Sequence, residues 1–176
     1  MKVAIDVGHA SGTGARGNGL EEHEECTGIA RHLHQALTAR GIESVIIDNP
    51  QLGNREDLNE AIREVNAGEY DLAVSLHCDC SDNASARGAH VCYVSSAGAR
   101  CAALIAEPLC RLLPGRAMTT VYRGNLAILT RTRCTAVLVE CGFISNVGDA
   151  GVIHNEKAKI AECIAAGIQA WSSVNG

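Results

Sequence analysis

The chain has 176 residues, of which 47% are hydrophobic and 20% charged, and a formal net charge of −5 at pH 7. This length suits one domain that buries most of its apolar surface, so we expect 1–176 to form a single domain, with 172–176 as a tail or the start of a linker. The acidity and the scarcity of aromatic residues argue against a nucleic-acid partner, and no segment reaches the roughly 20 apolar residues of a membrane span.

The first residues, MKVAID, lead directly into an apolar strand pattern and lack the hydrophobic core of a signal peptide. We therefore expect synthesis in the cytoplasm, where cysteines stay reduced. The nine cysteines agree with this expectation, because their number is odd and several lie in apolar runs. Cys78 and Cys80 form a C-x-C pair, but no second close pair completes a four-sulfur metal site.

Hydrophobic periodicity predicts strands that alternate with helices along the whole chain. In chain order, the expected elements are a strand at 2–7, a helix at 21–40 ended by Gly41, a strand at 44–48, a helix at 55–67, strands at 71–77 and 89–94, a helix at 98–113, strands at 126–129 and 135–140, and a helix at 155–171. The almost continuously apolar run at 135–140 is typical of a central strand covered on both faces. This alternation predicts an α/β protein with three α/β/α layers around a mostly parallel, twisted sheet of about six strands.

Three of the predicted strands end in polar groups that are costly to bury. His9 follows the first strand, His77 ends the third and Glu140 ends the strand expected at the centre. Ligands bind beyond the carboxyl ends of the strands in open α/β sheets, so these side chains converge if the strands are parallel neighbours. Each residue has an ordinary structural explanation by itself, but their coincidence favours a shared function.

Two imidazoles and one carboxylate are the ligand set of a catalytic zinc that leaves one position open for water. A carboxylate for this set is available in EEHEE at 21–25. Acids are also common in the first turn of a helix because they interact favourably with the helix dipole. The two histidines and Glu22 can hold the ion, although spacing alone does not choose Glu22 over Glu21 and does not exclude His23. Glu140 can then take a proton from water, as hydrolysis requires.

The glycine-rich loop between the first strand and the first helix permits a different interpretation. GTGARG at 12–17 spells G-x-G-x-x-G, the fingerprint of a dinucleotide-binding loop. In that motif the third glycine lies in the helix that receives the pyrophosphate, but no helix can start here before about Glu21. The glutamates of that helix would repel phosphate, and Asp48 lies too far along the chain to bind the ribose. We therefore expect the glycines to let the loop turn sharply and bring Glu22 beside His9.

Taken together, these motifs resemble the zinc-dependent N-acetylmuramoyl-L-alanine amidases of the type-3 amidase family, which are bacterial and phage peptidoglycan hydrolases. The resemblance covers residues 3 to about 172 and rests on AIDVGH, GARGNGLEE, NRED, VSLHCD and AVLVECGFISN, in the family's order. It implies that His9, Glu22 and His77 bind one zinc ion and that Glu140 is the catalytic glutamate. It also matches Arg55 to a frequent arginine, for which we expect a structural role.

The sequence departs from the family pattern close to this site. Val7 replaces the usual proline, and Asp79 stands where an amide is usual, between Cys78 and Cys80. Asp79 would add negative charge near the ion, and the two cysteines could compete as ligands. Strand alternation, however, turns Cys78 and Cys141 away from the cleft, which argues against sulfur ligands and against a cysteine nucleophile.

The implied reaction is hydrolysis of the amide between the lactyl group of N-acetylmuramic acid and L-alanine, by a single catalytic domain with peptidoglycan as its partner. Alternatives are a zinc peptidase that cuts the stem peptide, a wall-binding module without catalysis, and a NAD-type oxidoreductase. We expect the chain to act on the cell wall without membrane insertion. It would be a phage or prophage endolysin, which we favour, or the excised catalytic domain of a secreted autolysin.

Overall fold

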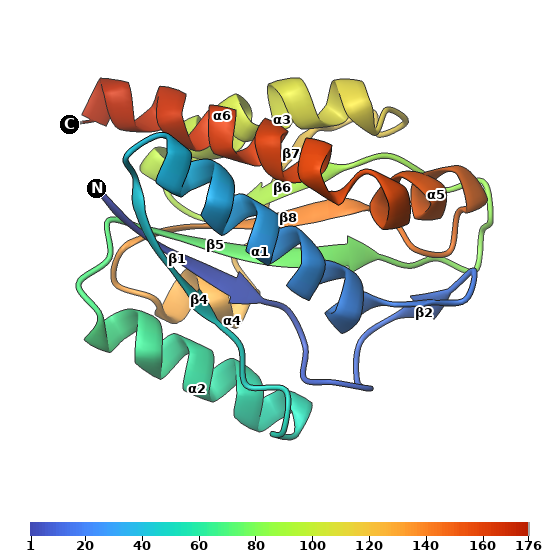
Figure 1. The fold of residues 1–176 in the computed structure, drawn as a ribbon, viewed down its shortest axis with the longest axis horizontal. Helices are drawn as coiled ribbons and strands as arrows, with labels where there is room; N and C mark the ends of the chain where they lie inside the picture. The colour runs from blue at the N-terminus through green and yellow to red at the C-terminus, as the bar shows by residue number, and fades with distance from the viewer. Residues whose placement is uncertain (176) are drawn as a thin grey trace.

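Strands from the whole length of the chain form one six-stranded sheet in the computed structural model, which describes residues 1–175 (Figure 1). In chain order these strands are β1 (Lys2–Val7), β4 (Glu43–Ile47), β5 (Leu72–Asp79), β6 (His90–Tyr93), β7 (Thr120–Tyr122) and β8 (Thr135–Phe143). Their spatial order is β4-β1-β5-β8-β6-β7. A separate antiparallel pair, β2 (Arg16–Gly17) and β3 (Leu20–Glu21), folds the loop that follows β1 into a hairpin.

The sheet is mostly parallel, as the alternation of strands and helices predicts. β1 pairs in parallel with β4 and β5, and β5 pairs in parallel with β8. β6 runs antiparallel to β8 and parallel to β7. The carboxyl ends of β1, β5 and β8 therefore meet the beginning of β6 at one edge of the sheet, which we call the active edge.

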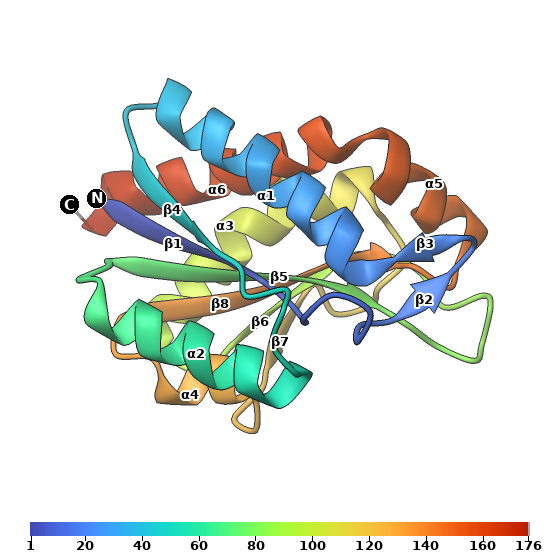
Figure 2. The ribbon, with the colours of Figure 1, turned by 60° about the horizontal axis from the view of Figure 1, so that its bottom comes forward.

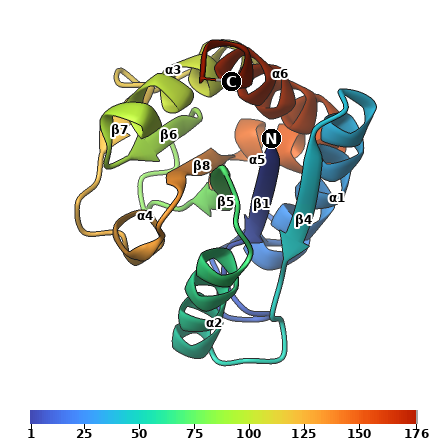
Figure 3. The same ribbon diagram turned by 90° about the vertical axis from the view of Figure 1, so that its left-hand side faces the viewer.

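Helices cover both faces of the sheet. They are α1 (Glu22–Ala39), α2 (Asn54–Ala67), α3 (Ser96–Leu112), α4 (Ala127–Arg131), α5 (Val147–Asn155) and α6 (Lys157–Asn175). The turned views show α1, α3 and α6 on one face, and α2 and α4 on the other (Figure 2, Figure 3). None of the helices in the described part of the chain combines the length and apolar character needed to cross a membrane.

Strand alternation divides the buried side chains between these two layers. Leu76 belongs to the larger core cluster, with residues of α1, α3 and α6, whereas Leu138 belongs to the smaller cluster, with residues of α2 and α4. Because successive strand residues point to opposite faces, His77 and Glu140 point toward the α2 and α4 side. The three-layer α/β/α prediction is confirmed.

One predicted strand is wrong. Residues 126–129 lie at the start of the short helix α4, whose Ile128 and Leu129 are buried. A four-residue apolar run fits a helical turn as well as a strand. Here the helical turn packs on the face of the sheet that α2 also covers. The sixth strand is instead β7, which lies at the sheet edge, is partly exposed and carries no apolar run.

The C-terminal region also differs from the expected pattern. α5 precedes the expected helix, and the Asn146 side chain caps it by accepting hydrogen bonds from the Gly148 and Asp149 N–H groups. Two glycines within α5 weaken its helical pattern in the sequence. Residues 172–175, expected as a tail or linker, continue α6, and Gly176 lies outside the described residues.

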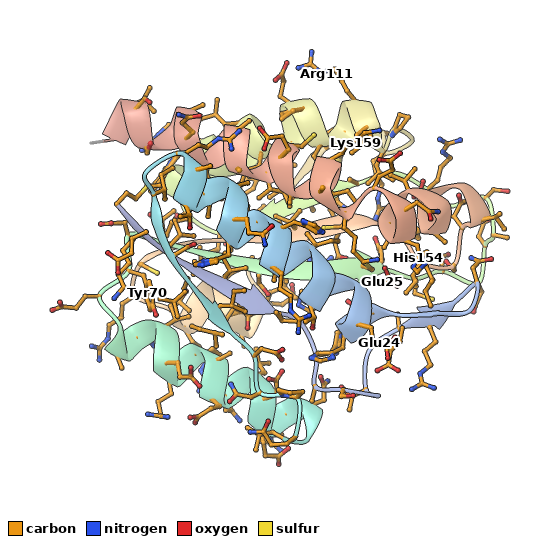
Figure 4. The ribbon with its side chains drawn as sticks, viewed as in Figure 1. Glu24, Glu25, Tyr70, Arg111, His154 and Lys159 are labelled. Atoms are coloured by element: carbon orange, nitrogen blue, oxygen red, sulfur yellow. The ribbon has the colours of Figure 1, made fainter. Side chains whose placement is uncertain are left out.

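The buried side chain of Glu25 holds α1 against α5 and α6. Glu25 is buried, and its Oε1 lies 3.1 Å from Nδ1 of His154 while its Oε2 lies 2.5 Å from Nζ of Lys157. Figure 4 shows Glu25 and His154 side by side and the exposed Glu24 next to them on α1. An acid in the first turn of a helix interacts favourably with the helix dipole, but Glu25 does more, because its contacts also fix the start of α1.

The packing of α3 on α6 leaves no room for a side chain at Gly167. A Cβ at this position would lie 2.5 Å from the Ile105 Cα. We expect Gly167→Ala to lower the free energy of unfolding by about 1–3 kcal/mol, because the helix backbones must separate. Thermal unfolding should then show a lower Tm, by about 2–4 °C per kcal/mol.

Gly151→Ala is the matched control for this experiment. Gly151 lies in α5 and would place its Cβ more than 4 Å from any neighbouring atom outside its own helix backbone. Alanine should stabilise that helix slightly, by up to about 1 kcal/mol. Equal Tm values for Gly167→Ala and the wild type would show that the helix contact is not as close as described.

Candidate metal centre

The two candidate histidines lie at the ends of neighbouring parallel strands. Gly8 donates a backbone hydrogen bond of 2.9 Å to the Leu76 carbonyl, which continues the β1–β5 pairing up to His9. The rings of His9 and His77 meet edge to face, with centroids 4.9 Å apart. A Cβ on residue 8 would lie 2.4 Å from Cε1 of His77, so this close approach requires glycine.

Glu22 completes a three-residue group with these histidines. The loop folds back so that the Glu22 N–H reaches the Ala15 carbonyl, and the Ala15 N–H donates to Glu22 Oε2 at 2.7 Å. Glu22 Oε1 accepts hydrogen bonds from the Cys78 N–H at 2.9 Å and lies 3.1 Å from His77 Nδ1. Its Oε2 lies 3.4 Å from Nε2 of His9. One donor atom from each of His9, Glu22 and His77 lies within 4.8 Å of the others, so these three side chains could hold a metal ion.

The side chains next to Glu22 point elsewhere. Glu21 accepts a hydrogen bond from the Gly12 N–H and forms an ion pair of 2.9 Å with Arg16. His23 lies 2.9 Å from Asp48 Oδ1. Of the three residues that the spacing left open, Glu22 is therefore the one that meets both histidines.

The surroundings shift the pKa values of the buried groups. Burial alone would raise the pKa of Glu22, but its hydrogen bond with His77 and the positive charge of that ring hold the value below normal. Burial likewise disfavours the charged form of His77, yet the hydrogen bond with Glu22 and the charge of Glu140 raise its pKa to about 9. The negative groups around His77 thus favour positive charge at this position, which a bound divalent cation also supplies.

Glu140 lies beside this group on the next strand. It is the register partner of His77 in the β5–β8 pair, so the two side chains share a face of the sheet. Burial raises the pKa of Glu140 to about 7, against the opposing effect of the His77 charge. Its Oε2 is buried and has no hydrogen-bond partner among the described residues. Buried polar atoms nearly always have a hydrogen-bond partner. We therefore expect water or substrate to supply the partner of this oxygen.

The cysteines near the site face the opposite layer. Cys78 and Cys141 are buried in the core cluster with α1, and Cys78 Sγ lies 3.9 Å from Cys26 Sγ. Burial also raises the pKa of the Cys141 thiol far above its normal value, which disfavours a nucleophilic thiolate. The prediction that Cys78 and Cys141 turn away from the cleft is confirmed, and all nine cysteines are free thiols.

Two polar residues behind the site were missed in the sequence. His9 Nδ1 lies 2.8 Å from Oδ1 of Asn54, the first residue of α2, so a proton on Nδ1 leaves Nε2 free to face Glu22. Asp6 is buried, accepts a hydrogen bond of 2.5 Å from Ser75, and lines a cavity of about 90 Å³ with both histidines. Asn54 belongs to the NRED segment, where our interpretation had emphasised the exposed Arg55 instead.

The comparison with known proteins agrees with this geometry. A family model described as N-acetylmuramoyl-L-alanine amidase (Amidase_3) matches residues 3–170. The chain belongs to this amidase family. It is therefore an N-acetylmuramoyl-L-alanine amidase, a hydrolase, and the family implies peptidoglycan as its substrate.

Individual relatives of the amidase are moderately similar in sequence. The uncharacterized protein YqiI of Bacillus subtilis (strain 168) is 29% identical over 96% of this chain and 84% of that protein. The N-acetylmuramoyl-L-alanine amidase LytC of the same organism is 29% identical over 92% of this chain, but the match spans 34% of LytC. The solved catalytic domain of CD27L, an endolysin targeting Clostridia Difficile, is 29% identical, with a TM-score of 0.88 and 96% coverage of each chain.

Replacement of adjacent glutamates tests which one completes the site of the amidase. We expect Glu22→Gln to lose most bound metal, because a neutral amide is a weaker ligand and leaves the histidines without their shared carboxylate. Glu21→Gln should keep the wild-type metal content, since Glu21 contacts Gly12 and Arg16 instead. Metal content after dialysis, measured by atomic absorption, distinguishes the two; equal retention by both variants would contradict the assignment of Glu22.

A second adjacent pair tests how His9 is oriented. Asn54→Ala should lower metal affinity by about 10–100-fold, as loss of a hydrogen-bond partner of a ligand typically does. Arg55→Ala is the matched control, because Arg55 is exposed and we expect its loss to leave the affinity unchanged. Titration with a competing chelator gives both values, and a larger loss in Arg55→Ala than in Asn54→Ala would contradict this description.

Proposed function

We propose that this amidase holds one zinc ion with His9, Glu22 and His77, and that Glu140 moves the proton during hydrolysis of the amide between N-acetylmuramic acid and L-alanine. The observation that carries the proposal is the meeting of three ligand-type atoms within 4.8 Å, beside a buried carboxylate whose Oε2 has no partner in residues 1–175. Either feature alone has structural explanations, but hydrolysis by a metal-dependent amidase needs both.

The donor set fits zinc. Two imidazole nitrogens and one carboxylate oxygen form a mixed N/O site of the kind that catalytic zinc occupies with a further position open. The hydrogen bond between His9 and Asn54, and those from the Ala15 and Cys78 N–H groups to Glu22, keep the ligands oriented. When bound, zinc would polarise the amide carbonyl and make water more acidic.

Glu140 has the properties that a proton-transferring group requires. Its pKa of about 7 allows it to accept a proton from the attacking water and to release that proton near neutral pH. The alanine nitrogen must be protonated to leave, and Glu140 lies on the same face as His77, where the reacting amide would bind. His77 is assigned to the metal in this proposal, so its ring is not available as the base for the same step.

We further propose that residues 1–176 act as one catalytic domain on the cell wall. The match to 96% of the CD27L catalytic domain supports an endolysin-type unit, and the match to 34% of LytC equally suits the catalytic part of a longer autolysin. A zinc peptidase that cuts within the stem peptide is the alternative that shares the same ligands. The products separate these activities, because an amidase frees an intact stem with a new L-alanine amine.

The decisive experiment is Glu140→Gln, assayed on purified peptidoglycan. We expect the variant to retain about one zinc per chain and to lose about 10²–10⁴-fold in the rate of stem-peptide release, the usual contribution of general acid–base catalysis. Mass spectrometry of the released peptides should show L-alanine at the amino terminus for the wild type.

Glu24→Gln is the matched control, since Glu24 is an exposed acid at the surface of α1. It should keep both zinc and rate. Full activity of Glu140→Gln would refute its role in proton transfer, whereas wild-type products cut inside the stem would replace the amidase reaction with a peptidase reaction.

A further inference from the structure

A charged pair lies next to Glu140 at the active edge and has no part in the proposed reaction. Arg116 forms an ion pair with Asp79, and the two side chains keep 35% and 25% of their surface exposed. The Arg116 guanidinium lies 4.7 Å from the centroid of the Phe143 ring, so it packs against a buried aromatic side chain. Such stacking holds the planar guanidinium in place while its edge stays accessible.

The pair lies on the Glu140 side of the active edge. Asp79 follows His77 by two residues on β5, and after an irregularity in the register it pairs with Phe143 at the end of β8. The charges of Asp79 and Arg116 both reach Glu140, where the first raises and the second lowers its pKa. A substrate group that extends from Glu140 toward Asp79 would therefore meet the charge of Arg116.

His90 does not neutralise Asp79 in this cluster. It is the register partner of Glu140 on β6, and its Nδ1 lies 3.9 Å from Asp79 Oδ2, beyond hydrogen-bond distance. Burial and the Arg116 charge lower its pKa to about 4, so the ring is neutral near pH 7. Asp79 is the carboxylate that forms an ion pair with Arg116, and a guanidinium has five N–H donors, more than one carboxylate can accept.

We propose that Arg116 is a specificity-determining residue that receives a free carboxylate of the stem peptide, with Asp79 as its internal counter-ion before substrate binds. This inference rests on the proposed amidase function and deepens it. This role predicts that the enzyme prefers a stem peptide with a free carboxylate next to L-alanine over one in which that carboxylate is converted to an amide. Arginine binds a carboxylate through two parallel, charge-assisted hydrogen bonds, which an amide cannot reproduce.

The test uses the zinc-loaded enzyme and two soluble muramyl peptides that differ only in this carboxylate or its amide. kcat/KM is measured for each substrate by chromatography of the released peptide. We expect the wild type to prefer the free acid by about tenfold or more, the fold-change that a charged hydrogen bond supplies. Arg116→Gln should bring the acid-to-amide ratio close to one, mainly through a higher KM for the acid, and Arg116→Lys should restore part of the preference.

Two further variants make the test specific. Asp79→Asn removes the internal competitor of the substrate carboxylate and should raise the ratio above the wild-type value. Arg133→Gln is the control, because Arg133 is an exposed arginine just before β8, at the opposite edge of the sheet, and its loss should change neither the rate nor the ratio.

The ratio separates a specificity role from a structural one. A purely structural Arg116 would lower kcat/KM for both substrates in proportion and leave the ratio unchanged, which would overturn the inference. A wild type that cleaves both substrates equally would overturn it as well, while leaving the proposed amidase function intact. Cleavage of neither substrate by the zinc-loaded wild type would instead refute the proposed function, and this inference with it.

Discussion

The buried carboxylate of Glu22 is the interaction on which the rest of the site depends. With a side chain only 3% exposed, an ionised carboxylate must be paired or hydrogen-bonded, since an isolated buried charge is very unfavourable. Here the N–H groups of Ala15 and Cys78 and the two histidines surround it. These partners come from the glycine-rich loop and from the ends of two strands, so one side chain at the start of α1 joins three parts of the chain. The same set of contacts that stabilises its charge also brings ligand-type atoms of His9, Glu22 and His77 within 4.8 Å of one another.

The register of the sheet is the second constraint. Because β5 and β8 are parallel and in register, His77 and Glu140 lie side by side, and the antiparallel β6 brings His90 next to Glu140 from the other side. Successive side chains of these strands point to opposite faces of the sheet. The polar groups therefore face the α2 and α4 side, and Cys78 and Cys141 face α1. A shift of one residue in β8 would bury Glu140 in the apolar core and expose Cys141 to the cleft. The position of the proposed acid–base group is therefore as strongly determined as the hydrophobic core itself.

Much of this arrangement could be predicted from the sequence, because it depends on periodicity and on residues at strand ends. The layers, the mostly parallel sheet and the three residues of the metal-capable group follow from local patterns and from the family resemblance. Contacts between distant segments could not be predicted in this way. The hydrogen bond between Asn54 and His9 joins α2 to the end of β1, and the left-handed backbone of His9, with φ 64°, has no signature in the sequence. The short elements α4 and β7 were not predicted either, because each contains too few residues for its hydrophobic period to be recognised.

The fold also explains how two glutamates at one edge acquire opposite properties. Glu22 is surrounded by hydrogen-bond donors and positive charge, which hold its pKa below normal and keep it ionised as a ligand should be. Glu140 has an oxygen without a partner in the described part of the chain, and its burial raises its pKa to about 7. Environments that separate the pKa values of two titratable groups are how active sites assign distinct roles to like side chains. The difference arises from backbone geometry: the N–H groups of Ala15 in the loop before α1 and of Cys78 in β5 point at the Glu22 carboxylate, whereas Oε2 of Glu140 has no such donor among the described residues. The proposed role of each carboxylate thus follows from its position in the fold, at the start of a helix or inside a strand.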